Sequence, residues 1–469
     1  MIIRGHTRIK HATAVLAALS FSTEPIISQA VNGFQYPQTR ISRRHRYSSS
    51  SYMSNRDSDI TASGPLKEKE EPLTLKDVQQ IYAISDLHTD NPSNMEWLKS
   101  MCEKPEVVNG DIKSTDDHTG IPTKSDALII AGDISHDLSK LEDTLSFIKE
   151  SLNCHVFFIW GNHEAWIGGE EMDALGIESS MEKIKEVKNV CHQLGVYTDF
   201  QLVGASNENP AFIVPIESWY DGSLSLDGCE DLCQNFKSWP WVDFKRCVWP
   251  DDSFLAEWHD DTALEDNVCN IPLGLTHFYQ NLNRETVEKV RRFYLMKSKT
   301  AVKALPGLIT YSHFLPNKQT LPDWKDPSSD IFMREDWLDH PVPEVSAKFA
   351  KVAGSKLIDE QIRNIVPPSL KPTPHAVQHL HVFGHSHRPK DFVMEGIRYI
   401  HNPLGKPVER DMKMVSDNVG FQKIWDCTKG SNTPPTKIDM ELSSLGAYHS
   451  GGEVPGQRII RYWEGTFPT

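Results

Sequence analysis

Five short apolar runs in this chain each end directly in residue types that bind metal ions. The segments at these ends are Ser85-Asp86-Leu87-His88, Gly132-Asp133, Gly161-Asn162-His163-Glu164, Ser312-His313 and Gly384-His385-Ser386-His387. In an α/β fold the carboxyl ends of the strands meet at one edge of the sheet, and ligands bind there. Side chains that are far apart in sequence are therefore expected to converge in one polar site.

The spacing of apolar residues predicts strands that alternate with helices. Strands are predicted at residues 81–84, 127–131, 156–160, 211–215, 308–311, 379–383 and 397–400. Helices are predicted at residues 139–152 and 181–194, because apolar residues recur there at helical spacing. Strands and helices in this rhythm indicate an α/β fold.

Carboxylate oxygens and imidazole nitrogens at the strand ends suit divalent or trivalent manganese, iron or zinc. Two ions about 3.5–4 Å apart need a bridging carboxylate and a bridging water or hydroxide. Their charge lowers the pKa of that water and stabilises negative charge on a phosphate. Each segment alone is more often a helix cap, a loop or an exposed strand face. Five such segments in series favour a metal site.

The series D-x-H, G-D, G-N-H-E, H and G-H-x-H resembles the calcineurin-like metallophosphoesterase superfamily. It occurs here as SDLH, AGDI, GNHE, YSHF and GHSH, in the superfamily's order, over about residues 81–403. The amino-acid sequences of residues 86–90, 94–97 and 310–316 are similar to those of a branch of the superfamily found in plants and algae. The resemblance implies two mixed β-sheets flanked by helices in four layers, α/β/β/α. It also implies hydrolysis of a phosphate mono- or diester, with a bridging hydroxide as the nucleophile.

The resemblance also implies a role for each residue that matches a motif. Asp86, His88 and His387 would hold the first metal, Asp133 would bridge, and Asn162, His313 and His385 would hold the second metal. Asn162 and His163 would contact the phosphate, and His163 would protonate the leaving oxygen. Arg388 is a candidate phosphate ligand, with a surface arginine paired to an acid as the alternative.

Two differences from the motifs of well-known branches argue against membership of those branches. Purple acid phosphatases place a tyrosine three residues after the bridging aspartate, where this chain has His136, which argues against a tyrosinate-bound ferric site. Ser/Thr protein phosphatases carry G-D-x-V-D-R-G, whereas residues 132–137 contain no arginine. The missing phosphate-binding arginine argues against protein phosphatase activity.

The charge of the chain bears on its partners. The net charge is −15, and because residues 1–56 carry +7, the rest carries −22. A negatively charged domain repels nucleic acid at long range. We therefore favour a small phosphoester over a nucleic acid as the substrate, and we expect no stable nucleic-acid complex. A non-catalytic scaffold on the same fold, like the retromer subunit of the superfamily, is the third hypothesis. It is disfavoured because every ligand position and His163 are present.

Residues 1–75 are predicted to be a targeting peptide and a disordered linker. They are rich in Arg and Ser and nearly free of acids up to residue 56, with a short apolar stretch at residues 14–19. This composition resembles a signal peptide followed by a transit peptide, a combination that would target the protein to a plastid. A mitochondrial or cytoplasmic location, or a basic tail with no address, is the alternative. No apolar run reaches about 18 residues, so a transmembrane helix is not expected.

The folded part is predicted to be one metallophosphoesterase domain at residues 76–410, followed by an irregular tail at residues 411–469. A Trp-rich insertion at about residues 221–304, with four tryptophans and three acidic pairs, would form a cap over the site. Its cysteines would be free thiols, since their spacing is irregular for a zinc knot made of Cys229, Cys233, Cys247 and Cys269.

Several residues near the motifs are predicted to be structural. His379 and His381 alternate with Leu380 and Val382 and are expected on one face of a strand. The remaining candidates are assigned to the core, the wall of the site or a turn: Tyr311, Trp160, Asn402 and Pro403.

Overall fold

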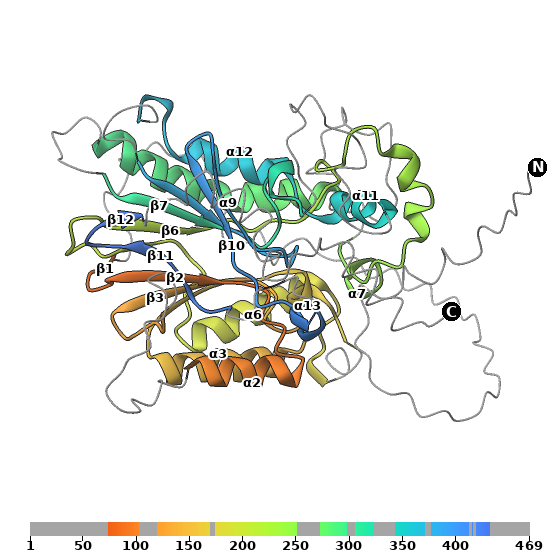
Figure 1. Ribbon diagram of the computed structural model, residues 1–469, viewed down its shortest axis with the longest axis horizontal. Helices are drawn as coiled ribbons and strands as arrows, with labels where there is room; N and C mark the ends of the chain where they lie inside the picture. The colour runs from red at the N-terminus through yellow and green to blue at the C-terminus, as the bar shows by residue number, and fades with distance from the viewer. Residues whose placement is uncertain are drawn as a thin grey trace, which may run out of the picture. The chain divides into compact units, whose positions relative to one another are not determined.

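Two mixed β-sheets face each other in the computed structural model (Figure 1). The seven-stranded sheet contains, in spatial order, β1 (Thr74–Leu75), β5 (Gln201–Val203), β6 (Ala211–Pro215), β7 (Gly307–Tyr311), β8 (His379–Val382), β10 (Ile397–His401) and β9 (Lys390–Met394). The five-stranded sheet contains β12 (Gly430–Ser431), β11 (Gln422–Asp426), β2 (Gln80–Ile84), β3 (Asp126–Ala131) and β4 (His155–Ile159).

The structure describes residues 74–102, 120–168, 174–250, 273–297, 305–322, 343–370, 377–411, 415 and 419–431. The targeting peptide and linker were predicted at residues 1–75, of which residues 1–73 lie outside these ranges, as do Trp258 and Cys269. Among the described helices, none is both long and apolar enough to cross a membrane.

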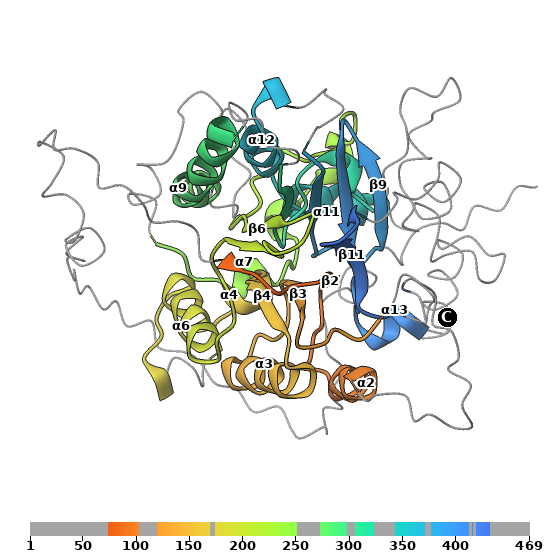
Figure 2. The same ribbon diagram turned by 90° about the vertical axis from the view of Figure 1, so that its left-hand side faces the viewer.

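Helices cover the outer face of each sheet (Figures 1 and 2). The five-stranded sheet is covered by α2 (Pro92–Cys102), α3 (Leu138–Leu152) and α6 (Ser180–Gln193), and the seven-stranded sheet by α9 (Leu273–Lys297) and α12 (Lys356–Ile365). The remaining helices are α4 (Asn162–Ala165), η2 (Glu230–Cys233), η3 (Phe236–Ser238), α7 (Asp243–Arg246), η5 (Lys318–Thr320), α11 (Pro343–Val352), η6 (Pro368–Leu370) and α13 (Pro407–Asp411). These layers confirm the predicted α/β fold with two mixed sheets flanked by helices.

Strands β2, β3, β4, β6 and β7 are buried along almost their whole length, on both faces, which explains why their sequences are mostly apolar. In β3, Ala127 and Ile129 face the other sheet, whereas Leu128 and Ile130 face the helices. Each strand therefore contributes alternate residues to two cores, one between the sheets and one beneath the helices. Tyr311 is fully buried in the core between the sheets, as predicted.

Local signals set the ends of the helices that were predicted from periodicity. The Asp137 side chain accepts a hydrogen bond from the Lys140 N–H at the start of α3, and Asn153 ends this helix in the left-handed conformation. Ser179 and Glu182 form a capping box at the start of α6. Both helices were predicted to within one residue at each end.

The irregular tail predicted at residues 411–469 and the insertion predicted at about residues 221–304 each contain a regular element of the folded domain. Strand β11 lies inside the predicted irregular tail and pairs antiparallel with β2, and its Trp425 is buried between the sheets. Helix α9 lies inside the predicted Trp-rich insertion and packs on the seven-stranded sheet through contacts such as Phe293 with Phe212. Both elements depend on pairing or packing with distant segments, which local periodicity does not reveal.

Gly307 of β7 lies against the Trp425 side chain of the other sheet. A Cβ atom at this position would lie 2.1 Å from Cη2 of Trp425. We expect Gly307→Ala to lower the free energy of unfolding by about 1–3 kcal/mol, because overpacked cores distort. Urea denaturation would measure this change. The cost should shrink in a Trp425→Leu background, and an equal cost in both backgrounds would contradict the assignment of the clash to this pair.

Candidate metal centre

All five motif segments directly follow strands, and they lie at one edge of the sandwich. The segments with Asp86, Asp133 and Asn162 follow β2, β3 and β4 of the five-stranded sheet. Those with His313 and His385 follow β7 and β8 of the seven-stranded sheet. The strands within each set are parallel, so their carboxyl ends point the same way. The site therefore forms where the ends of both sheets meet.

The backbone in these segments adopts a conformation that non-glycine residues rarely occupy. Five of the eight non-glycine residues with positive φ in the described part of the chain are predicted ligands, with φ between 43° and 73°: Asp86, His88, Asp133, His385 and His387. Such a residue costs about 1–3 kcal/mol and persists only where its surroundings hold it. The concentration of strain in these segments indicates a functional site.

Backbone hydrogen bonds between neighbouring segments hold this conformation. The Asp86 N–H donates to Gly132 O at 3.0 Å, and the His88 N–H donates to Asp133 O at 2.9 Å. The His385 N–H donates to the Asp86 Oδ1 at 2.8 Å. The five segments thus brace one another rather than forming independent loops.

Glycine is required where the segments approach most closely. Gly132 has a φ of +84°, and a Cβ there would lie 2.2 Å from Nδ1 of His313. A Cβ on Gly161 would lie 2.2 Å from Oδ1 of Asp133. Any side chain at either position would displace a predicted ligand.

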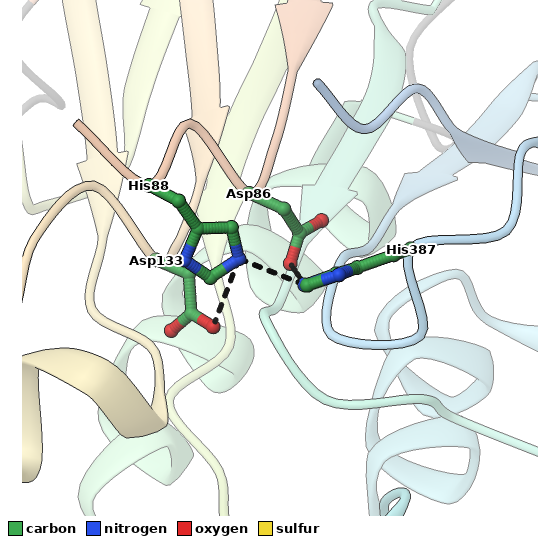
Figure 3. A group of neighbouring side chains, drawn as sticks. All are labelled: Asp86, His88, Asp133 and His387. Atoms are coloured by element: carbon green, nitrogen blue, oxygen red, sulfur yellow. Dashed lines mark hydrogen bonds and ion pairs between the residues drawn. The ribbon is translucent and has the colours of Figure 1, made fainter. Parts of the chain in front are cut away.

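Asp86, His88, Asp133 and His387 form the first group of converging ligand atoms (Figure 3). One ligand atom from each lies within 4.8 Å of the others. The Nε2 atoms of His88 and His387 are 2.8 Å apart, and the His387 Nε2 is 3.5 Å from the Asp86 Oδ1. This group matches the ligand set predicted for the first metal together with the predicted bridge.

Asp133, His313 and His385 form a second group, again with ligand atoms within 4.8 Å of one another. The Asn162 Oδ1 lies beside this second group, 3.1 Å from the His313 Nε2 and 3.0 Å from the His385 Nδ1. These four residues are the predicted bridge and the ligands predicted for the second metal.

Asp133 faces both groups at once, with a different oxygen toward each. Its Oδ2 is 4.0 Å from the His88 Nε2, and its Oδ1 is 3.4 Å from the His313 Nε2. A carboxylate between two sets of ligands is the arrangement that a bridge between two ions requires.

The tautomers of three histidines leave the correct ring nitrogen free for a metal. A ligand histidine usually donates its other N–H to a carbonyl or carboxylate. His313 Nδ1 lies 3.0 Å from Ala131 O, and His385 Nε2 lies 3.1 Å from Val352 O. His387 Nδ1 lies 2.8 Å from the Glu409 carboxylate. With these nitrogens donating, the converging ring nitrogens carry lone pairs.

Burial favours the neutral form of the His88, His313 and His385 imidazoles, which a metal ligand needs. It lowers the pKa of His313 to about 4 and the pKa values of His88 and His385 well below the ordinary value. Burial, followed by the charges of Glu164 and Asp86, raises the pKa of Asp133 well above its ordinary value. A bound cation would oppose that rise. The donor set therefore fits ions of the manganese, iron or zinc type.

His163 lies beside the two groups. Its Nε2 is 3.8 Å from the Asp133 Oδ2, and its ring stacks on Trp166 at a centroid distance of 3.7 Å. Its Nδ1 is buried with no hydrogen-bond partner among the described residues. With His88 and Asp90 it forms a third cluster of potential ligand atoms. The proton-donor role of His163 thus stays a prediction.

Arg388 is half-buried next to His387, and among the described residues its side chain has no hydrogen bond to a predicted ligand. Its phosphate-binding role also stays a prediction. Lys406, which the motifs did not indicate, is a second nearby cation, because its charge lowers the pKa values of His88 and His163. The preceding residue, Gly405, donates its N–H to Asp86 O at 3.0 Å.

Glu164 supports the site although no role was predicted for it. Its carboxylate accepts N–H groups of four residues at 2.6–3.0 Å: Asp133, Ile134, Ser135 and Gly161. Burial raises its pKa to about 7 against the effect of these bonds. Glu164 was visible in the sequence as the last residue of the GNHE motif.

His401 anchors Asp86, a role that was not predicted for it, and Asn402 holds the backbone beside it. The His401 Nε2 lies 3.1 Å from the Asp86 Oδ2. The Asn402 side chain donates to Ala83 O and Gly420 O, and Asn402 O accepts the Ser85 N–H. Asn402 is thus structural, as predicted. No local signal identified His401, because it lies at the end of an ordinary apolar strand.

The other predicted structural residues follow their assignments. His379 and His381 are buried in β8 on the face opposite to Leu380 and Val382. Trp160 is 3% exposed and belongs to the core. Of the four cysteines proposed for a zinc knot, the three in the described part are free thiols and belong to none of the potential metal clusters found there.

The depressed histidine pKa values predict how metal binding depends on pH. The pKa of His313 is lowered to about 4, whereas the ordinary pKa of a histidine is about 6.5. The His313 imidazole therefore stays neutral as the pH falls from about 6.5 to about 4. We expect metal retained after dialysis at pH 5.5 and released as the pH falls through about 4. Elemental analysis after dialysis measures this, and complete loss already at pH 6.5 would contradict it.

Comparisons with known proteins place this site in a family. A sequence profile of the calcineurin-like phosphoesterases matches residues 80–389. The acyl-carrier-protein phosphodiesterase PptH of Mycobacterium tuberculosis is 25% identical over 157 residues, which are 33% of this chain and 41% of that protein. This chain therefore matches less than half the length of that relative.

The crystal structure of phosphopantetheinyl hydrolase PptH from Mycobacterium tuberculosis aligns with a TM-score of 0.46 at 18% identity, over 72% of this chain and 93% of that chain. The family profile covers more than half of the 469 residues and all five motif segments. This chain is therefore a member of the calcineurin-like phosphoesterase family.

Proposed function

We propose that this protein hydrolyses a phosphate mono- or diester with the help of two metal ions. The observation that carries this proposal is the position of Asp133, whose two carboxylate oxygens face separate groups of ligands. Asp86, His88 and His387 would hold one ion, and Asn162, His313 and His385 the other. When bound, the ions activate a water molecule and neutralise charge on the phosphate.

His163 would supply the proton to the leaving oxygen. Its Nε2 points toward Asp133 and hence toward the space between the two ligand groups. In the free protein, burial and the charges of His88 and Lys406 lower its pKa well below the ordinary value. A phosphate anion beside the ring would favour the imidazolium form, because an opposite charge raises the pKa of a histidine. Substrate binding would thus load the proton that His163 donates.

Two cations are candidates to bind the phosphate from outside the ligand groups. Arg388 follows His387 directly, and Lys406 acts electrostatically on His88 and His163. Either side chain would hold a non-bridging oxygen and orient the ester. Comparing Arg388→Gln with Lys406→Gln would identify which of the two raises KM when it is removed.

The name of the relative supports a diester as the first substrate to test. PptH is described as a phosphodiesterase, over a match of 157 residues. A small phosphoester remains the favoured class because residues 57–469 carry a charge of −22. Faster turnover of single-stranded DNA than of small esters would instead favour a nuclease. Bound metal without turnover of any ester would favour a binding scaffold.

Asp133→Asn tests the bridge. The amide is nearly isosteric but uncharged, so it should fail to hold two cations close together. We expect the metal content of the folded protein to fall sharply and hydrolysis of bis-p-nitrophenyl phosphate with added Mn²⁺ to be lost. Elemental analysis of the purified variant would measure the metal content. Unchanged metal content and rate would remove Asp133 from the centre.

His163→Ala tests the proton donor. We expect the metal content to stay at the native level while kcat falls by roughly 10²–10⁴-fold. The exposed His192 on α6 offers a matched control, and His192→Ala should leave both quantities unchanged. If His163→Ala loses metal together with activity, His163 is a ligand rather than a proton donor.

A further inference from the structure

Asp243 is a buried carboxylate that no sequence motif identifies. It is the first residue of α7, within the predicted Trp-rich insertion, and only 2% of it is exposed. Its Oδ1 accepts hydrogen bonds from the Asn162 Nδ2 at 3.0 Å and the Trp166 Nε1 at 2.6 Å. Its Oδ2 accepts one from the Trp241 Nε1 at 2.9 Å. All three donors lie at or beside the candidate metal centre.

The bond to Asn162 sets the direction of an amide that would otherwise be ambiguous. The oxygen and nitrogen of an asparagine amide are similar in size, so its hydrogen-bond partners decide which way it points. A carboxylate only accepts, and therefore it binds the Nδ2 side. The Asn162 Oδ1 is then directed to the His313 Nε2 at 3.1 Å and the His385 Nδ1 at 3.0 Å. A reversed amide would present N–H groups to the second metal position.

The bond to Trp166 extends the same control to His163. The Trp166 ring stacks on the His163 ring at a centroid distance of 3.7 Å with an interplanar angle of 31°. Because the Trp166 Nε1 is tied to Asp243, the indole plane that supports His163 cannot turn freely. One carboxylate therefore orients both a predicted ligand and the support of the predicted proton donor.

A purely structural role explains these contacts less well. A buried carboxylate pays a desolvation penalty of several kcal/mol, and only good hydrogen bonds offset it. The two tryptophan N–H groups and the Tyr220 hydroxyl, which also bonds to this carboxylate, would be satisfied by a neutral acceptor at a lower cost. The additional donor, the Asn162 amide, is the one that needs an acceptor that cannot also donate.

We propose that Asp243 is a positioning residue, which directs Asn162 toward the second metal and steadies His163 through Trp166. This inference rests on the proposed dinuclear function. It gives the Trp-rich segment a task beyond covering the site, because the segment supplies the group that completes the second ligand set. Within the described part of the chain, Asp86, His88 and His387 make no hydrogen bond to Asp243, so binding of the first metal should be independent of it.

Asp243→Asn should therefore weaken only one of the two metal sites. We expect the affinity for the second Mn²⁺ to fall by about 10–100-fold, as for other groups that orient metal ligands, while the first Mn²⁺ stays bound. Mn²⁺ titration of the folded variant, with metal analysis after gel filtration, separates the two sites. Loss of neither metal or of both equally would overturn the proposal.

Asp221→Asn is the matched control, because Asp221 lies in the same segment and its carboxylate binds only Ser223 and Ser355 among the described residues. It should keep both metals and full activity. If native protein binds no metal and hydrolyses no ester, the proposed function fails. If the native protein binds metal and hydrolyses an ester, and Asp243→Asn binds both Mn²⁺ ions with the native affinities, only the positioning role fails.

Asn162→Asp provides a second test that does not depend on the folding of the Asp243 variant. The substitution keeps a ligand oxygen and adds a charge, which by itself should tighten metal binding. Across the 3.0 Å contact with Asp243, however, it places two carboxylates face to face. We expect weaker binding of the second Mn²⁺. Equal or tighter binding would show that Asp243 does not position residue 162.

Discussion

The carboxylate of Asp133 is the group on which the rest of the site depends. It is 2% exposed, and burial together with the charges of Glu164 and Asp86 raises its pKa. A buried group of this kind is stable as an anion only beside compensating positive charge. Burial favours the neutral form of the His88 and His313 imidazoles that face it, so these rings do not supply that charge. Cations in the proposed metal centre would supply that charge, and the two directions in which Asp133 points set where they would lie.

Around this group, three further acids hold the ligands in place without being predicted ligands themselves. Glu164 gathers four backbone N–H groups of the segments that carry Asp133 and Asn162. Glu409 sets the tautomer of His387, and Asp243 sets the direction of the Asn162 amide. Each comes from a different part of the chain. Together they explain how segments with positive φ at five ligand positions remain in a conformation that is unfavourable in isolation.

Much of the ligand set could be predicted because each ligand is next to a strongly apolar strand. Asp86, Asp133 and His313 follow continuous apolar runs, and the ends of parallel strands meet at one edge for reasons of geometry alone. The supporting residues could not be found in this way. Asp243 and Glu409 lie in short helices without periodicity, and His401 ends an ordinary strand, so nothing local distinguishes them from surface acids or core residues.

The sequence by itself determined the α/β class, the strands that are buried on both faces and the residues that converge at their ends. These features follow from local composition and strand geometry, because a continuous apolar run needs a buried position and the carboxyl ends of parallel strands meet at one edge. Only the tertiary structure decided that β11 completes the five-stranded sheet and that α9 covers the seven-stranded one. It also decided which acid faces which ligand. The physical reason is that pairing and packing between distant segments, rather than local propensity, stabilise these elements and orient these side chains.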